Sequence, residues 1–67
     1  MINVSINGDI KIFENNITLK EILNILKYDN DCFASAVNTT FVPIKQYELI
    51  IIKDGDKIDI LSPIQGG

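Results

Sequence analysis

The chain contains no histidine, no arginine and no tryptophan, and Cys32 is its one cysteine. Histidine is the commonest metal ligand and a frequent general base, so its absence removes much of the usual catalytic chemistry. A lone cysteine forms no disulfide or multi-cysteine metal site within one chain, and we interpret Cys32 as a small core residue. With 67 residues the chain has room for one modest core. We therefore expect no self-contained enzyme, no bound cofactor and no metal.

Positive charge and long apolar runs are also scarce. Six lysines against nine carboxylates give a net charge of −3, and the lysines are scattered along the chain. This pattern disfavours a nucleic-acid partner, because phosphate binding depends on clustered cations. The longest apolar run, residues 49–52, is too short to cross a membrane. With no signal peptide visible after Met1, we expect a cytoplasmic protein without a membrane partner.

Apolar and polar residues alternate along residues 2–6 and again along residues 10–14, with the period of a β-strand. The dipeptide Asn7-Gly8 between them favours the left-handed backbone angles of a two-residue hairpin turn. The first unit is therefore predicted to be a β-hairpin.

A single helix is predicted to follow. Thr18 and Glu21 have the spacing of a capping box, in which each side chain bonds to a backbone N–H of the first turn. Apolar residues then recur at helical spacing and predict one buried stripe, formed by Leu19, Ile22, Leu23 and Leu26.

The second half of the chain predicts short strands. Residues 33–37 are small and mostly apolar, as in a strand covered on both faces, and residues 38–40 form a turn. Pro43 excludes a central-strand position. Residues 44–48 fit a loop or one helical turn, and residues 49–52 fit a short strand.

The last strand is predicted at residues 57–61, where Ile58 and Ile60 alternate and point inward. The preceding segment, Asp54-Gly55-Asp56, favours a turn over a cation site, because it lacks the other ligands of a calcium loop.

These elements predict an α+β fold of the ubiquitin-like β-grasp type. One helix covers one face of a mixed four- to five-stranded sheet, whose first and last strands pair in parallel at the centre. We expect residues 1–62 to form this domain and residues 63–67 to form a flexible tail that ends in Gly66-Gly67. Alternation leaves Leu61 exposed at the start of the tail.

Several segments together resemble the small sulfur carriers of thiamine biosynthesis, the ThiS type within the ThiS/MoaD superfamily. They are Ala36-Val37-Asn38, Phe41-Val42-Pro43, Tyr47, residues 53–60 and the final diglycine. The resemblance covers essentially the whole chain. It departs at Thr39, where many relatives have glycine, and at Ile44, where a basic residue is common.

The resemblance implies that the protein is a co-substrate rather than an enzyme. A ThiF-like adenylating enzyme would use ATP to activate the carboxylate of Gly67. Sulfur from a cysteine desulfurase or another persulfide donor would replace AMP, and the thiocarboxylate would go to a ThiG-like thiazole synthase. Ile64, Gln65 and Gly66 would thread into the partner, and Leu61 is a candidate docking residue.

Physical chemistry agrees with this role for the tail. Glycine has no Cβ, so the backbone can pass through a narrow channel. The six residues after Leu61 span about 20 Å at roughly 3.3 Å per extended residue. Gly67 can therefore enter a partner's nucleotide site while the globular domain stays outside.

Three alternatives remain at this point. A MoaD-like small subunit of molybdopterin synthase uses the same tail to deliver sulfur to a pterin. A ubiquitin-like modifier is joined to lysines through its final glycine. A plain β-grasp interaction domain would carry the two glycines incidentally, and their deletion would then leave its activity intact.

Overall fold

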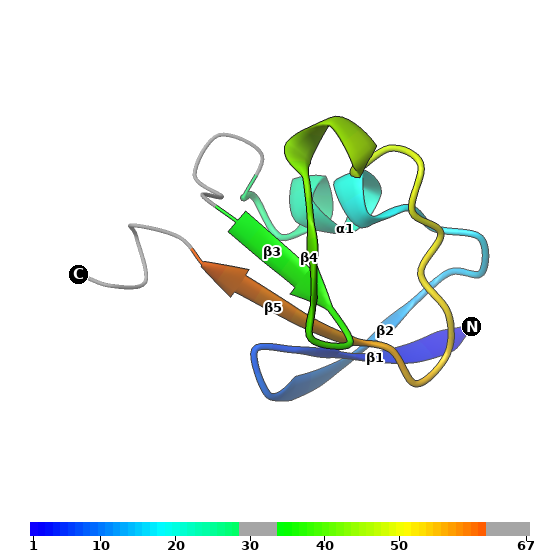
Figure 1. The fold of residues 1–67 in the computed structure, drawn as a ribbon. Helices are drawn as coiled ribbons and strands as arrows, with labels where there is room; N and C mark the ends of the chain where they lie inside the picture. The colour runs from blue at the N-terminus through cyan, green and yellow to red at the C-terminus, as the bar shows by residue number, and fades with distance from the viewer. Residues whose placement is uncertain (29–33, 62–67) are drawn as a thin grey trace.

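A computed structural model describes residues 1–28 and 34–61 of the chain (Figure 1). In chain order its elements are β1 (Ile2–Ile6), β2 (Asp9–Phe13), α1 (Leu19–Ile25), β3 (Ala34–Val37), β4 (Thr40–Val42), a 3-10 turn η1 (Ile44–Gln46) and β5 (Lys57–Leu61).

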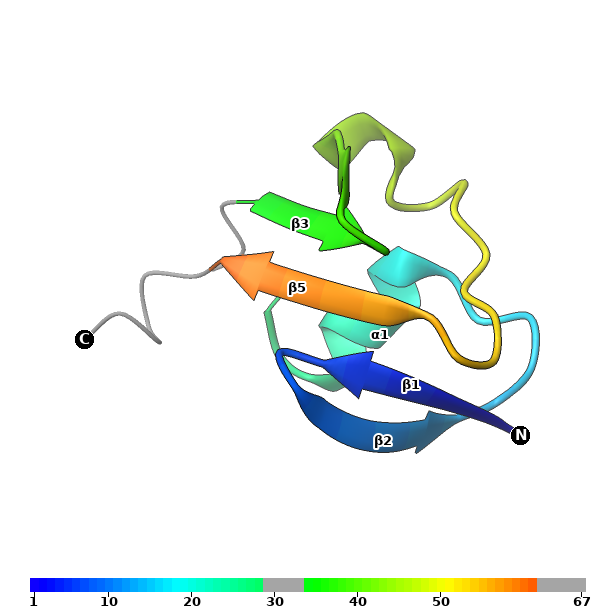
Figure 2. The ribbon, with the colours of Figure 1, turned by 60° about the horizontal axis from the view of Figure 1, so that its bottom comes forward.

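The strands form one mixed sheet in the order β2-β1-β5-β3-β4. The central strand, β5, pairs in parallel with β1, and the other neighbouring pairs are antiparallel. Figure 2 shows α1 behind the sheet. The predicted β-grasp arrangement is confirmed, with five strands and one helix covering one face.

Two tight hairpin turns set the strand register. Asn7 and Gly8 have φ angles of 50° and 93°, and Ile6 pairs with Asp9 across this two-residue turn, as predicted. Asn38 and Thr39 form the second turn with φ angles of 51° and 70°. The turn therefore keeps left-handed angles at Thr39, even though a threonine there is sterically disfavoured.

The core lies between α1 and the sheet. Thr18 and Glu21 form the predicted capping box: Thr18 Oγ1 accepts a bond from the Glu21 N–H at 3.1 Å, and Glu21 Oε1 accepts one from the Thr18 N–H at 2.9 Å. The helix buries Leu19, Ile22 and Leu23, while Leu26 is half-buried against them. The buried side chains of the sheet lie on the helix side, among them Val4, Ile6, Val42, Ile58 and Ile60.

The strand expected at residues 49–52 is wrong. Ile51 makes one isolated bridge with Thr18, and the segment bonds to the chain that leads into α1. The Leu19 N–H donates to the Ile50 carbonyl at 2.9 Å, and the Ile52 N–H donates to the Ile17 carbonyl at 2.8 Å. Its backbone groups are therefore satisfied outside the sheet.

The expectation that residues 33–37 are covered on both faces is also wrong for the described part, residues 34–37. Ser35 is buried on the helix side, whereas Ala34 and Ala36 are half-buried on the other side. The cause is architectural, because α1 covers the opposite face of the sheet and the outer face remains open.

Candidate functional site

The predicted reactive end of the chain follows directly from the centre of the sheet. Gly67, Gly66, Gln65 and Ile64 lie outside the described residues, as does Cys32. The strand that leads to the first four, β5, is described to its end at Leu61. It is held on one edge by β1 and on the other by β3, so the strand before the predicted tail is anchored within the sheet.

Leu61 lies on the open face of the sheet, and its predicted exposure is confirmed. Its side chain is 64% exposed, whereas Ile60 is 6% exposed and points toward the core. Ala34 pairs with Leu61 across the β3–β5 ladder. One face of β5 therefore contributes side chains to the core, and the other face lies at the surface.

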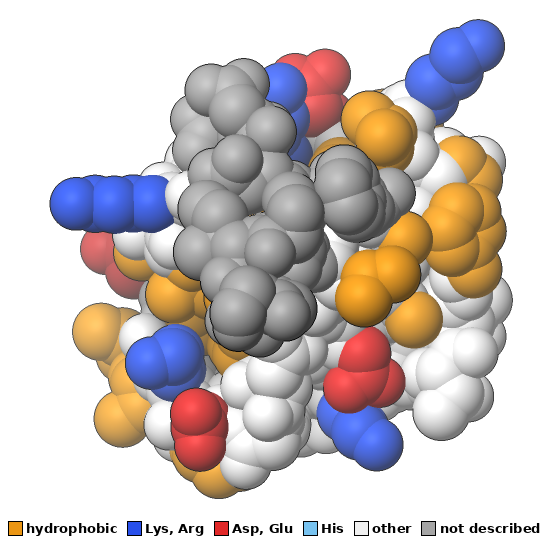
Figure 3. Space-filling view, turned by 90° about the vertical axis from the view of Figure 1, so that its left-hand side faces the viewer, with side chains coloured by type: hydrophobic (Ala, Val, Ile, Leu, Met, Phe, Trp, Pro, Cys, Tyr) orange, Lys and Arg blue, Asp and Glu red, His pale blue; other side chains and the backbone are white. Residues whose placement is uncertain are grey.

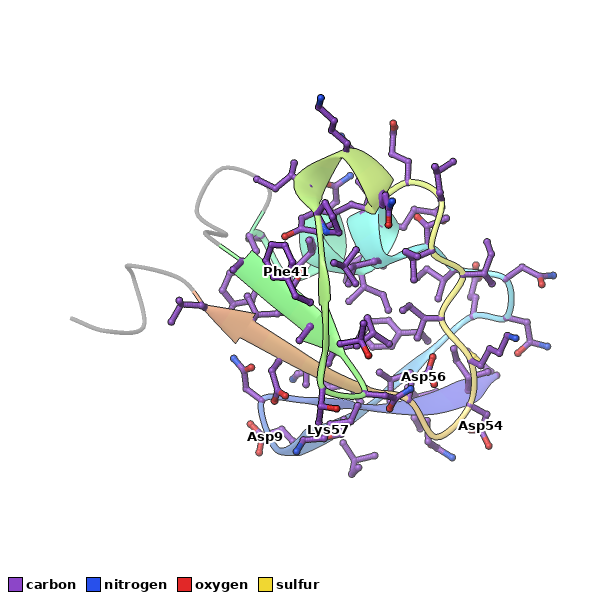
Figure 4. The ribbon with its side chains drawn as sticks, in the orientation of Figure 1. Asp9, Phe41, Asp54, Asp56 and Lys57 are labelled. Atoms are coloured by element: carbon purple, nitrogen blue, oxygen red, sulfur yellow. The ribbon has the colours of Figure 1, made fainter. Side chains whose placement is uncertain are left out.

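Leu61 belongs to a small apolar surface that we call the β5-end patch, formed by Ala34, Ala36, Phe41 and Leu61. Together with Ser35, Asp59 and Ile60, these residues line one shallow hollow beside the end of β5. Phe41, labelled in Figure 4, pairs with Ala36 and is 62% exposed. Figure 3 views the molecule from the side on which β5 ends and shows hydrophobic side chains at the surface there. Sequence reasoning found Leu61 but did not assign Phe41 to a site.

The two aspartates in the loop before β5 both accept hydrogen bonds from backbone N–H groups. Asp54 Oδ1 accepts a bond from the Asn3 N–H at 2.8 Å, and Asp56 Oδ2 accepts one from the Lys53 N–H at 2.8 Å (Figure 4). Gly55 has a φ of +88°, which an L-residue rarely adopts. The predicted turn is confirmed, and within the described residues no group of three acidic, histidine or cysteine side chains could hold a metal.

Two asparagines fasten opposite ends of β5, and sequence reasoning assigned them only to turns. At the start of the strand, Asn38 Oδ1 accepts a bond from the Lys57 N–H at 2.9 Å. At its end, Asn7 Oδ1 accepts a bond from the Ile60 N–H at 2.7 Å, and Asn7 Nδ2 donates to the Ile60 carbonyl at 3.3 Å. Each asparagine therefore serves both its own turn and the central strand.

This fold defines the class of protein. The structure superposes with a TM-score of 0.82 on the crystal structure of thiamine biosynthesis protein ThiS from Geobacter metallireducens, with 22% identity, 98% of this chain and 100% of that chain covered. The chain is therefore a small β-grasp protein of the ThiS fold.

The family model for ThiS matches residues 2–67, so the chain belongs to the ThiS family. Proteins of this family are sulfur carriers and not enzymes.

Two curated proteins have sequences similar to that of this chain. One is the uncharacterized protein ycf40 of Porphyra purpurea, 29% identical over 66 residues, which cover 98% of this chain and 93% of that protein. The other is a thiazole synthase of Paramagnetospirillum magneticum, 34% identical over 62 residues. That match covers 92% of this chain but 19% of the synthase.

Within the described residues, no helix is both long and apolar enough to cross a membrane.

Proposed function

We propose that the protein carries sulfur as a thiocarboxylate on Gly67 for synthesis of the thiazole ring of thiamine. The observation that carries this proposal is the match to the ThiS family over residues 2–67, which includes the final diglycine. The matching segment within a thiazole synthase supports delivery of the sulfur to such an enzyme.

The proposed chemistry has two steps. An adenylating partner joins the Gly67 carboxylate to AMP from ATP and releases pyrophosphate, which turns a poor electrophile into an activated acyl group. In the second step, the outer sulfur of a persulfide, derived from a cysteine desulfurase or another donor, displaces AMP to form an acyl disulfide, and a thiol cleaves its S–S bond, which leaves the thiocarboxylate on Gly67 and a disulfide between that thiol and the donor's cysteine. Residues 1–62 act as the domain that the partner holds, and residues 63–67 act as the flexible tail, with Ile64, Gln65 and Gly66 in the partner's channel.

The β5-end patch is the proposed docking surface for the adenylating partner. It adjoins the residue from which the tail departs, so contact there places the tail at the partner's channel. Leu61 and Phe41 are 64% and 62% exposed, and both lie on the open face. Burial of such side chains against a partner would stabilise the complex by roughly 25 cal/mol for each Å² of apolar surface removed from water.

A matched pair of variants tests the docking surface. Leu61→Asp places a charge in the β5-end patch, and Ile10→Asp places the same charge on the same face but on edge strand β2, where Ile10 is 69% exposed. We expect Leu61→Asp to raise the KM for the carrier in the adenylation reaction by about tenfold, whereas Ile10→Asp leaves it within about twofold. Equal effects of the two substitutions would contradict docking at the patch.

The function itself is tested by incubating the protein with ATP, its adenylating partner and a sulfur donor. The intact mass should increase by the difference between sulfur and oxygen. Omission of ATP is the control, because no acyl-adenylate then forms. In the cell, deletion of the gene should cause a thiamine requirement; loss of molybdenum-enzyme activity instead would favour the molybdopterin pathway.

A further inference from the structure

We propose that Asn7 is a positioning residue that fixes the end of β5 and thereby the direction in which the reactive tail leaves the sheet. This inference rests on the proposed function of the tail. It starts from the offset register between β1 and the central strand β5, each of which is five residues long.

The parallel ladder between β1 and β5 is short. Its paired residues are Ser5 with Lys57 and Ile6 with Ile58. The backbone N–H of Asn7 still donates to the Ile58 carbonyl at 2.9 Å, and the chain then turns away toward β2. At Ile60 the β1 backbone therefore no longer runs beside β5.

The side chain of Asn7 takes the place of that backbone. A carboxamide has the same donor and acceptor as a peptide group. Asn7 Oδ1 accepts from the Ile60 N–H at 2.7 Å, and Asn7 Nδ2 donates to the Ile60 carbonyl at 3.3 Å. The ladder is thereby extended to the residue immediately before Leu61.

Asparagine meets two requirements at this position. Its φ of 50° is in the left-handed region, which asparagine tolerates better than most residues. Glycine would satisfy the backbone but has no carboxamide, and aspartate would tolerate the turn but has no donor for the Ile60 carbonyl.

The bond pattern has a consequence for the reaction. Catalysis requires the reacting group to be held in a productive geometry, and small displacements reduce the rate strongly. With both Asn7 bonds in place, the backbone of Ile60 is held on its β1 side. Without them, the end of β5 becomes freer on its β1 side, and the tail samples more directions around the docked domain.

Asn38 supplies the matched control. It also has a φ near 50°, occupies the first position of a two-residue hairpin turn and bonds to β5 through its side chain. Its side chain accepts from the Lys57 N–H at 2.9 Å and donates to Asp56 Oδ1 at 3.0 Å, both at the opposite end of the strand from Leu61. Asn38→Gly therefore removes a comparable side chain without releasing the end that leads to Gly67.

The experiment compares steady-state adenylation of Asn7→Gly, Asn38→Gly and the unsubstituted protein by the adenylating partner, at a temperature where circular dichroism shows all three folded. We expect Asn7→Gly to lower kcat about tenfold with KM changed by less than about twofold, because docking is retained and positioning is lost. Asn38→Gly should leave both constants within about twofold. Should Asn7→Gly fail to fold, Asn7→Asp, which loses the donor to the Ile60 carbonyl, should still lower kcat more than Asn38→Gly does.

Amide hydrogen exchange provides the readout of the Asn7 bonds. Asn7→Gly should accelerate exchange of the Ile60 amide by about tenfold or more, and Asn38→Gly should do so for Lys57. Equal losses of kcat in the two variants, or unchanged Ile60 exchange in Asn7→Gly, would overturn the inference. If the unsubstituted protein is itself not adenylated, the proposed function fails, which is a different result.

Discussion

Buried and exposed side chains alternate along β5. Shortening a side chain should therefore affect the free energy of unfolding very differently at two positions of this strand. Ile58 is 0% exposed and Leu61 is 64% exposed, although only two residues separate them. Ile58→Ala and Leu61→Ala each remove three carbon atoms. The structure nevertheless predicts that the first lowers the free energy of unfolding far more than the second.

The magnitudes follow from burial. Three buried carbons contribute about 2.4 kcal/mol at roughly 0.8 kcal/mol each. The cavity left by Ile58→Ala adds to this, for a total of about 3–4 kcal/mol. For Leu61, with about a third of its surface buried, the expected loss is below about 1 kcal/mol. A domain of 67 residues has a total stability of about 3–10 kcal/mol, so Ile58→Ala removes a large share of it.

Equilibrium urea unfolding, followed by far-ultraviolet circular dichroism, measures both losses. If Ile58→Ala is unfolded without urea, Ile58→Val provides a graded value of about 1 kcal/mol. A difference of less than about 1 kcal/mol between Ile58→Ala and Leu61→Ala would refute the assignment of the two faces of β5.

Other substitutions test the local structure. Gly55→Ala should cost about 1–2 kcal/mol through its positive φ alone, because a Cβ there meets no atom within 4 Å; an unchanged urea midpoint would contradict this. Thr18→Ala should lower the free energy of unfolding by about 1 kcal/mol, since the capping box is lost, and the same titration measures it. Calcium in place of EDTA should leave the thermal midpoint unchanged, because Asp54 and Asp56 already accept backbone N–H groups.

The elements that depend on local signals could be predicted from the sequence. Asn7-Gly8 carries the hairpin geometry within two residues, and the bonds between Thr18 and Glu21 span three. The geometry of both features therefore depends on residues that are close in the sequence. The hairpin and the helix start are accordingly where they were expected.

Features that depend on distant partners could not be predicted in the same way. Residues 49–52 are apolar like a strand, but their backbone bonds go to Ile17 and Leu19. The second role of Asn7 depends on Ile60, which is 53 residues away. Alternation along a strand also does not show which of its two faces is covered by the rest of the protein. Ile10 of β2, for example, is apolar but lies on the uncovered face and is exposed.

We propose Gly67 as the reactive group because the family match over residues 2–67 includes the final diglycine. The described structure contributes the anchored strand β5 and the β5-end patch beside its last residue, Leu61. These features account for how a partner would hold the domain while it acts on the tail.

The most direct test of the central claim is the fragment mass spectrum of the protein after reaction with ATP, the adenylating partner and a sulfur donor. The account predicts one oxygen-to-sulfur exchange located at Gly67, with every fragment that lacks this residue unchanged in mass. An unmodified Gly67 in the presence of an adenylating partner proven active, or sulfur located at Cys32 instead, would contradict it.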